Sequence, residues 1–149
     1  MASCTLLLVA CASGPVRRVS EPSARIQQLT VRADGSWSTD LRIENFSSIP
    51  MRFDALRLEL EVGEHPAGTL QASPGVTIGP ESADVATVEL SPTAAAKFAV
   101  AEALADGRSV EYSLRGTMTA TPDEGRQREF EMERNSALSP APGLPGVMR

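Results

Sequence analysis

Apolar and polar side chains alternate through much of residues 25–134, and this period of two limits the fold more than any other feature of the chain. Successive side chains of a β-strand point to opposite faces, so the pattern is typical of strands with one buried and one solvated face. Turn signals separate the alternating segments, and Asp34-Gly35 is a strong hairpin signal. About seven short strands in about 110 residues predict an all-β fold, a two-layer antiparallel sandwich in the size range of immunoglobulin-like domains.

The alternation changes phase once inside a strand. Met51 and Phe53 are in one phase, and the apolar residues from Leu56 onward are in the other. A shift of one residue turns a strand over, so we predict a bulge or bend at Asp54-Ala55.

One helix is predicted between the late strands. Ser91 suits the N-cap, Pro92 suits the first helical position, and Gly107 is the expected stop. Its apolar face is narrow, so we expect the helix to lie at the edge or end of the β layers. That face consists of Phe98, Ala101, Leu104 and Ala105.

The composition fits one domain with an aliphatic core. The chain has 149 residues, of which 42% are hydrophobic but only 4% are aromatic. The formal net charge of -5 repels phosphate backbones, so we expect no nucleic-acid partner. The same sign argues against electrostatic docking on anionic lipid.

The first residues resemble the start of a bacterial lipoprotein. Residues 5–12 form the longest apolar run, which is too short for a bilayer span of about 20 residues but suits the apolar core of a signal peptide. Leu8-Val9-Ala10-Cys11 resembles the lipobox, whose cysteine is acylated and becomes the new N-terminus. The resemblance implies a signal peptide over residues 1–11, cleavage before Cys11 and a membrane anchor through lipid on Cys11. Because Ala12 rather than aspartate follows, it also implies an outer-membrane lipoprotein facing the periplasm.

Two alternatives stay open at this end of the chain. A signal peptide has Lys or Arg before its apolar core, and residues 1–4 contain neither, so a start upstream of Met1 stays open. Cys11 is also compatible with an unmodified cysteine in a short apolar segment.

The segments that flank the alternating region are rich in polar and turn-forming residues. Residues 12–24 are polar and interrupted by proline, which predicts a flexible tether. Residues 135–149 are rich in Ser, Pro, Gly and Ala, which predicts a disordered C-terminal tail. The folded domain is therefore expected over residues 25–134.

Several segments follow one another in an order that resembles a known family. They are residues 41–45 running into Ile49-Pro50-Met51, residues 56–60 before Gly63, and residues 110–116 after the predicted helix. They resemble the late embryogenesis abundant type 2 family, also called LEA14-like or the water stress and hypersensitive response (WHy) domain. The family's Asn-Pro-Asn motif is matched only by Asn45 of Asn45-Phe46-Ser47. The resemblance implies an immunoglobulin- or fibronectin-III-like sandwich with one helix, no known catalytic residues and a loose association with desiccation stress.

The sequence offers little for catalysis or metal binding. His65 is the only histidine, and both cysteines, Cys4 and Cys11, precede the folded region, so a zinc site lacks ligands. We therefore expect no enzyme, no catalytic residue, no cofactor and no metal. The paired carboxylates fall on the outward faces of predicted strands, as is typical of a solvated surface. These residues are Glu59, Glu61, Glu129, Glu131 and Glu133.

Two of three polar or aromatic residues allow two interpretations, and the third, Tyr112, allows one. Asn45 either belongs to a ligand-contacting loop or bonds local backbone and fixes a turn; the second is favoured. Trp37 either is an exposed contact residue or, as its alternation indicates, belongs to the core. Tyr112 is inward by phase, and its hydroxyl is expected to bond backbone.

Three classes of function remain from the sequence. The first is a lipid-anchored, non-catalytic domain that binds or shields other molecules during desiccation or envelope stress. The second is an accessory structural lipoprotein of an envelope or secretion assembly, with sandwich edges that recruit a partner strand. The third, an enzyme, needs a carboxylate cluster gathered in a deep pocket. The identity of a protein partner stays open.

Overall fold

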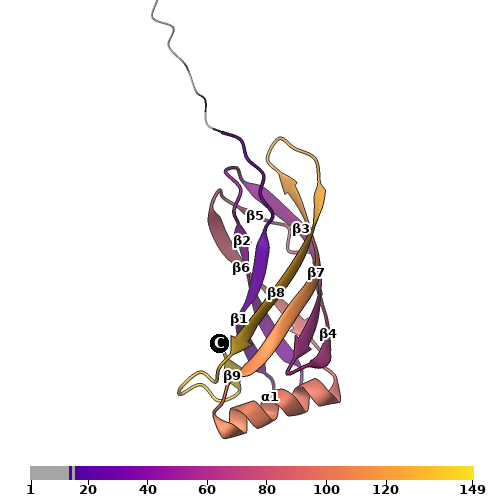
Figure 1. Ribbon diagram of the computed structural model, residues 1–149, viewed down its shortest axis with the longest axis vertical. Coiled ribbons are helices and arrows are strands. Elements are labelled where there is room, and N and C mark those ends of the chain that lie inside the picture. The colour runs from indigo at the N-terminus through magenta and orange to yellow at the C-terminus, as the bar shows by residue number, and fades with distance from the viewer. Residues whose placement is uncertain (1–13, 15) are drawn as a thin grey trace, which may run out of the picture.

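The computed structural model describes Gly14 and residues 16–149, so the predicted signal peptide, Cys4 and Cys11 lie outside the described residues. The described chain forms two antiparallel sheets and one helix, and the helix lies across one end of the sheets (Figure 1). The predicted all-β sandwich with a single helix is therefore confirmed. The described strands are more numerous than predicted because β5 and β9 are only 3 and 2 residues long.

The first sheet has the strand order β6-β2-β1-β9 and contains the hairpin predicted at Asp34-Gly35. At that turn the Arg32 amide donates to the Ser36 carbonyl oxygen over 2.9 Å, and Gly35 has a φ of 85°. A positive φ suits glycine, which explains the residue at this point. The strands are β1 (Ser23–Val31), β2 (Trp37–Asn45), β6 (Ser82–Leu90) and β9 (Val147–Met148).

The second sheet has the strand order β4-β3-β7-β8, and β5 pairs with one end of β3. Among the described residues β8 pairs only with β7, so β8 is an edge strand. The strands are β3 (Met51–Val62), β4 (His65–Ala72), β5 (Val76–Ile78), β7 (Val110–Pro122) and β8 (Arg128–Leu138).

The core lies between the two sheets and is mainly aliphatic, as the composition predicts. Trp37 is 1% exposed and Tyr112 is 4% exposed, so both are core residues, as their phase predicts. The largest fully buried aliphatic side chains come from both sheets. They are Leu29, Leu41, Ile43, Leu58, Leu60, Leu70, Leu114 and Leu138.

The phase change in β3 is a β-bulge, as predicted. The pairing of β3 with β7 shifts between Phe53 and Ala55, which leaves Asp54 outside the regular register. Phe53 before the bulge and Leu56 after it are both buried. The extra residue thus keeps both halves of the strand facing the same core.

The helix α1 (Ala94–Asp106) starts later than predicted and turns a different face inward. Thr93, not Ser91, is the N-cap, because its backbone is extended and its side chain accepts a 3.3 Å bond from the Ala96 amide. The Thr93 amide still bonds to the Ala67 carbonyl oxygen, which keeps the chain extended up to the cap. Gly107 ends the helix in a left-handed conformation, as predicted.

The predicted apolar face of α1 is wrong, since Phe98 is 70% exposed, Ala101 and Ala105 are exposed as well, and Leu104 is only half-buried. The buried residues are instead Ala96, Val100 and Ala103. Small side chains let the helix axis lie close to the strand ends, where a phenylalanine would hold it away. The expected position of the helix, at an end of the β layers, is confirmed (Figure 1).

The prediction of a disordered tail over 135–149 is wrong. β8 continues to Leu138, and β9 pairs with β1 through Leu29–Met148 and Thr30–Val147. Met148 is fully buried, and the Ser139 and Arg149 backbones exchange two hydrogen bonds of 2.7 and 2.9 Å. Burial of one large apolar side chain and a short ladder order a segment whose composition alone indicates disorder.

The flexible tether predicted over residues 12–24 is wrong for its C-terminal part. β1 begins at Ser23, two residues before the predicted domain start, and residues 16–20 bond to the loop between β2 and β3. This loop and the β7–β8 hairpin lie at one end of the sandwich, whereas α1 and the C-terminus lie at the other (Figure 1). Among the described residues, no helix has the length and apolar character needed to cross a membrane.

Candidate functional site

Asn45 holds together the end of the sandwich at which the β2–β3 loop lies. Its side-chain nitrogen lies 3.0 Å from the Ile49 and Ile78 carbonyl oxygens and 2.9 Å from that of Gly79. Its side-chain oxygen accepts a 2.9 Å bond from the Ser47 amide. The residue is 1% exposed, so both ends of the amide are occupied by backbone. This geometry supports the structural interpretation of Asn45 and leaves no polar atom of its side chain free for a ligand.

The two serines after Asn45 fasten the N-terminal segment to the same loop. Ser48 Oγ accepts a 2.7 Å bond from the Arg18 amide and donates a 2.7 Å bond to the Val16 carbonyl oxygen. The Ser48 amide in turn donates to the Arg18 carbonyl oxygen over 3.0 Å. Ser47 Oγ, which is buried, accepts a 2.8 Å bond from the Ser20 amide. The loop is therefore a docking point for residues 16–20, which we call the docked segment.

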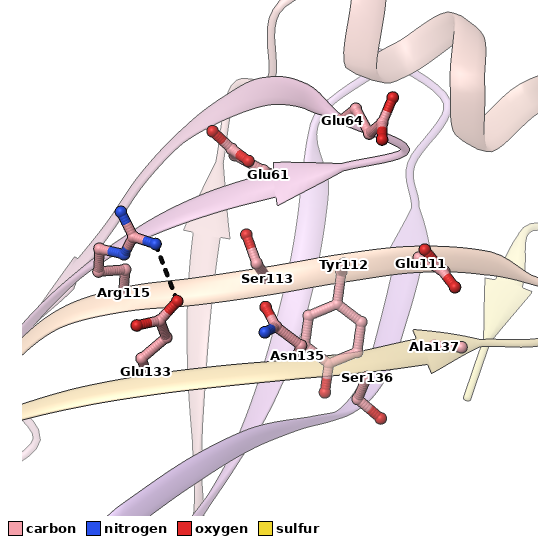
Figure 2. Close-up of a pocket in the computed structure, with 10 residues that line it drawn as sticks. All are labelled: Glu61, Glu64, Glu111, Tyr112, Ser113, Arg115, Glu133, Asn135, Ser136 and Ala137. Atoms are coloured by element: carbon pink, nitrogen blue, oxygen red, sulfur yellow. Dashed lines mark hydrogen bonds and ion pairs between the residues drawn. The ribbon is translucent and has the colours of Figure 1, made fainter.

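A wide hollow lies on the outer face of the second sheet, over β3, β7 and β8 (Figure 2). It has a volume of about 600 Å³ and is open to solvent on one side. Figure 2 shows carboxylates along its length, with Glu61 and Glu64 on one side and Glu111 and Glu133 on strands β7 and β8. Tyr112 also lines this hollow, although its side chain is buried in the core.

Arg115 is the basic residue of this hollow and is paired with a carboxylate. Its Nη2 donates a 2.8 Å bond to Glu133 Oε1 across the β7–β8 pair. The bond and charge of Glu133, with smaller contributions from Glu61 and Glu59, raise the pKa of the Arg115 guanidinium above its usual value. Both partners are more than half exposed, so the pair is a solvated surface ion pair of modest strength.

The carboxylates singled out from the sequence do not form an enzyme-like cluster. Glu59, Glu61 and Glu133 line neighbouring parts of the outer face rather than a deep pocket. His65 is exposed at the first position of β4. In the part of the chain that the structure describes, no group of three or more His, Cys, Asp or Glu side chains is placed to hold a metal ion.

Asp54 accepts hydrogen bonds from three side chains, and it was predicted from the sequence only as part of a bulge and not as a site residue. It sits at the β3 bulge and receives bonds from Arg52 Nε and Thr121 Oγ1 at 2.6 Å and from Gln127 at 3.1 Å. Partial burial alone raises the pKa of Asp54, but the bonds from Thr121, Arg52 and Gln127 outweigh it and lower the pKa. This carboxylate fastens the β7–β8 hairpin to β3, which is a structural role.

The docking role of Ser47 and Ser48 was likewise not predicted from the sequence. The available signal was the pair of small hydroxyl residues directly after Asn45, since serine favours side-chain bonds to nearby backbone. Their partners, Arg18 and Ser20, are about 30 residues away in the sequence, and no local pattern connects the two segments.

Comparisons with solved structures find similar folds at low sequence identity. A solution structure of a protein from Arabidopsis thaliana has a TM-score of 0.51 and 10% identity, with 88% of each chain covered. An Archaeoglobus fulgidus protein has a TM-score of 0.45 and 13% identity, covering 83% of this chain and 98% of its own. A structural genomics target, SoR45, has a TM-score of 0.47 and 14% identity, covering 83% of this chain and 89% of its own. The Arabidopsis structure supports the fold alone.

The sequence family gives the stronger assignment. No curated protein matches the chain. The sequence model of the family described as late embryogenesis abundant protein matches residues 40–134, which is more than half of the chain. The matched region runs from the middle of β2 to the middle of β8 and includes the Asn45 loop, the bulge and α1. This chain therefore belongs to the late embryogenesis abundant protein family, LEA_2.

Proposed function

We propose that this chain is a lipid-anchored, non-catalytic protein of the bacterial cell envelope, held at the outer membrane and facing the periplasm. In this role it binds or shields other molecules during desiccation or envelope stress. The observation that carries the anchor is the Leu8-Val9-Ala10-Cys11 motif, which stands five residues before the docked segment begins at Val16.

The non-catalytic role is supported by how the polar side chains of the described residues are used. The side-chain amide of Asn45 is fully occupied by hydrogen bonds to backbone, and Asp54 holds the β7–β8 hairpin against β3. Arg115 and Glu133 neutralise one another on an open surface. Acid–base catalysis needs a group poised against a substrate and partly shielded from water, and these side chains are structural or solvated instead.

The anchor is tested by replacing the proposed acyl acceptor in the full-length gene. Cys11→Ser removes the thiol, so we expect the protein to move from the membrane pellet to the soluble fraction. Globomycin, which inhibits lipoprotein signal peptidase, should leave a larger, uncleaved form. Cys4→Ser is the matched control because Cys4 lies within the proposed signal peptide, and it should leave fractionation unchanged. Membrane sedimentation of the Cys11→Ser protein would show that the anchor is wrong.

The protective role is tested in cells that lack the gene. We expect lower survival of the deletion strain after drying or osmotic shock, restored by the wild-type gene. The Cys11→Ser gene should restore survival poorly if protection depends on a position at the membrane. Equal survival of the deletion and parent strains would exclude a protective role under those conditions.

A specific observation favours a second candidate, an accessory subunit of an envelope assembly. β8 is 11 residues long, and among the described residues its outer edge has no partner strand. Such an edge can accept a strand from another protein. Affinity capture of this protein from detergent-solubilised envelope distinguishes the two roles. A partner protein captured in stoichiometric amount, and lost on Glu131→Pro substitution in β8, would favour the assembly. A diffuse set of captured proteins would favour general shielding.

A further inference from the structure

The docked segment gives the proposed anchor a fixed point of departure from the sandwich. Val16 and Arg18 are held on Ser48 by bonds of 2.7 Å, and the Arg18 side chain donates a 3.0 Å bond to the Phe46 carbonyl oxygen. Ion pairs reinforce this position, from Arg17 to Glu124 at 3.7 Å and from Arg18 to Glu81 at 3.6 Å. The chain therefore leaves the domain beside Phe46 and not from a free tether at residue 24.

The length of chain between Cys11 and Val16 limits how far this end can stand from a membrane. Five residues reach at most about 18 Å when fully extended. β7 is 13 residues long and runs toward the end opposite to α1, and 13 residues of strand span about 43 Å. An acyl chain on Cys11 thus holds the Phe46 end close to the bilayer and leaves α1 far from it.

The Phe46 end carries apolar side chains that the core does not use. Val16 is 80% exposed and Phe46 is 46% exposed, although the chain has only four phenylalanines. An aromatic side chain in the headgroup region of a bilayer buries its ring while its polar neighbours stay hydrated. Phe98, the other strongly exposed phenylalanine, lies on α1 at the opposite end.

The charges around Phe46 are balanced, which fits a surface without net charge. The hollow beside Phe46 is lined by Arg18 and Arg42 and by Glu44 and Glu81. These side chains form pairs, with Arg42 Nε at 3.4 Å from Glu44 Oε1 and Arg18 paired to Glu81. Because the positive and negative side chains neutralise one another, attraction to anionic lipid is not the source of contact here.

From these observations, and resting on the anchor proposed above, we propose that the β2–β3 loop is a membrane-contact surface. Phe46, with Val16 beside it, lies in the interfacial region of a bilayer of zwitterionic phospholipid. The docked segment sets this orientation, and α1 and the C-terminus project away from the membrane.

Lipid contact can be measured with a tryptophan placed at either end of the acylated protein. Phe46→Trp and Phe98→Trp are matched variants, because both original side chains are exposed phenylalanines. The proteins are extracted with their lipid, reconstituted into phosphatidylcholine vesicles, and measured with and without bromine on the acyl chains. Trp37 is buried and pairs with Leu90, the last residue of the strand before α1, so it contributes the same background to both variants.

We expect bromine to quench the tryptophan at position 46 several-fold more than the tryptophan at position 98. Adding anionic phosphatidylglycerol or raising the salt concentration should leave this ratio unchanged. In the Phe46→Trp background, Ser48→Ala should reduce the quenching while the protein still sediments with vesicles. The substitution removes the Ser48 Oγ bonds to Val16 and Arg18, which loosens the docked segment, and leaves the anchor unchanged.

Each other outcome contradicts a distinct part of the proposal. Sedimentation with vesicles but equal quenching at positions 46 and 98 overturns the orientation and leaves the anchor intact. Unchanged quenching in the Ser48→Ala variant shows that the Ser48 side-chain bonds to Val16 and Arg18 do not set the orientation. Failure of the Cys11-bearing protein to carry lipid or to sediment overturns the anchor and the orientation together.

Discussion

The phenolic oxygen of Tyr112 on β7 lies 3.1 Å from the backbone nitrogen of Ile26 on β1 and accepts its hydrogen bond. Tyr112 belongs to one sheet and Ile26 to the other, so this bond crosses the core. It falls where the pairing of β1 with β2 shifts, between Ile26 and Gln28. The tyrosine thus supplies an acceptor to a buried amide at an irregular point of the first sheet.

Tyr112→Phe should destabilise the domain because it removes this acceptor and leaves the Ile26 amide unsatisfied. A buried donor without a partner costs about 1–3 kcal/mol, so we expect the free energy of unfolding to fall by about that amount. Urea denaturation followed by far-UV circular dichroism measures the change. Ser113→Ala is the control, because Ser113 is half-buried on the outward side of the same strand. Equal stability of the Tyr112→Phe and wild-type proteins would show that water replaces the hydroxyl.

Gly116→Ala should be among the most damaging single-methyl substitutions in the chain. Gly116 pairs with Leu58 on β3 and Met132 on β8, and an added Cβ would overlap with the Arg57 carbonyl oxygen. The neighbouring strand must move, so we expect a loss of about 3 kcal/mol or more, as in overpacked interiors. Gly79→Ala is the control, since its Cβ would make only an ordinary 3.9 Å contact with Ser82. Thermal unfolding of both variants compares them, and similar melting temperatures would contradict the expected clash.

Asn45→Asp should destabilise the loop end of the sandwich and do so in a pH-dependent way. The substitution places a carboxylate against the Ile49, Ile78 and Gly79 carbonyl oxygens, and an unpaired buried charge costs about 3–5 kcal/mol. Because the environment favours the neutral form, the pKa of the new carboxyl is raised in the folded state, and the penalty shrinks as pH falls below that pKa. Denaturation at neutral and acidic pH tests this expectation. Asn135→Asp on the exposed outer face should lower stability little at either pH.

Asp54 gives the wild-type protein its own acid dependence. Its pKa is lowered in the folded state, so its contribution is complete above the unfolded value of about 3.9 and is lost as pH falls through the folded pKa. Asp54→Asn loses the charged acceptor of Arg52, Thr121 and Gln127, and we expect a loss of about 1–2 kcal/mol at neutral pH.

The stability difference between wild type and Asp54→Asn should therefore be constant from about pH 7 to pH 5 and narrow below about pH 4. Asp123→Asn, on the exposed β7–β8 hairpin, should show no such narrowing. A difference that persists unchanged to the lowest pH would show that Asp54 acts through shape rather than charge.

Local sequence patterns predicted the features that depend on neighbouring residues. The alternation placed Trp37 and Tyr112 inside, and the phase change located the bulge at Asp54. Gly107 ends the helix because the residue at this position adopts a left-handed backbone conformation, which glycine tolerates best. These features follow from periodicity and backbone preference, which a single sequence records.

The missed features depend on contacts between distant segments. The face that α1 buries is set by the ends of β3 and β4, so small residues face inward and Phe98 faces out. The docked segment is held by a loop about 30 residues away. The ordering of residues 139–149 depends on β1, which lies at the other end of the sequence. Composition near each segment carries no record of these partners.

The contribution of the C-terminal strand β9 to stability can be tested directly. Met148 is fully buried against the core although it is the penultimate residue, so Met148→Ala should create a cavity and cost about 2–5 kcal/mol. Leu144→Ala, in the preceding turn, is the matched control because Leu144 is 43% exposed and should change stability little. Urea denaturation compares the two variants. Hydrogen exchange of the Val31 amide, which donates to the Gly146 carbonyl oxygen over 2.8 Å, reports whether β1 loses its neighbour. A Met148→Ala protein as stable as wild type would show that burial of the Met148 side chain adds no stability to the sandwich.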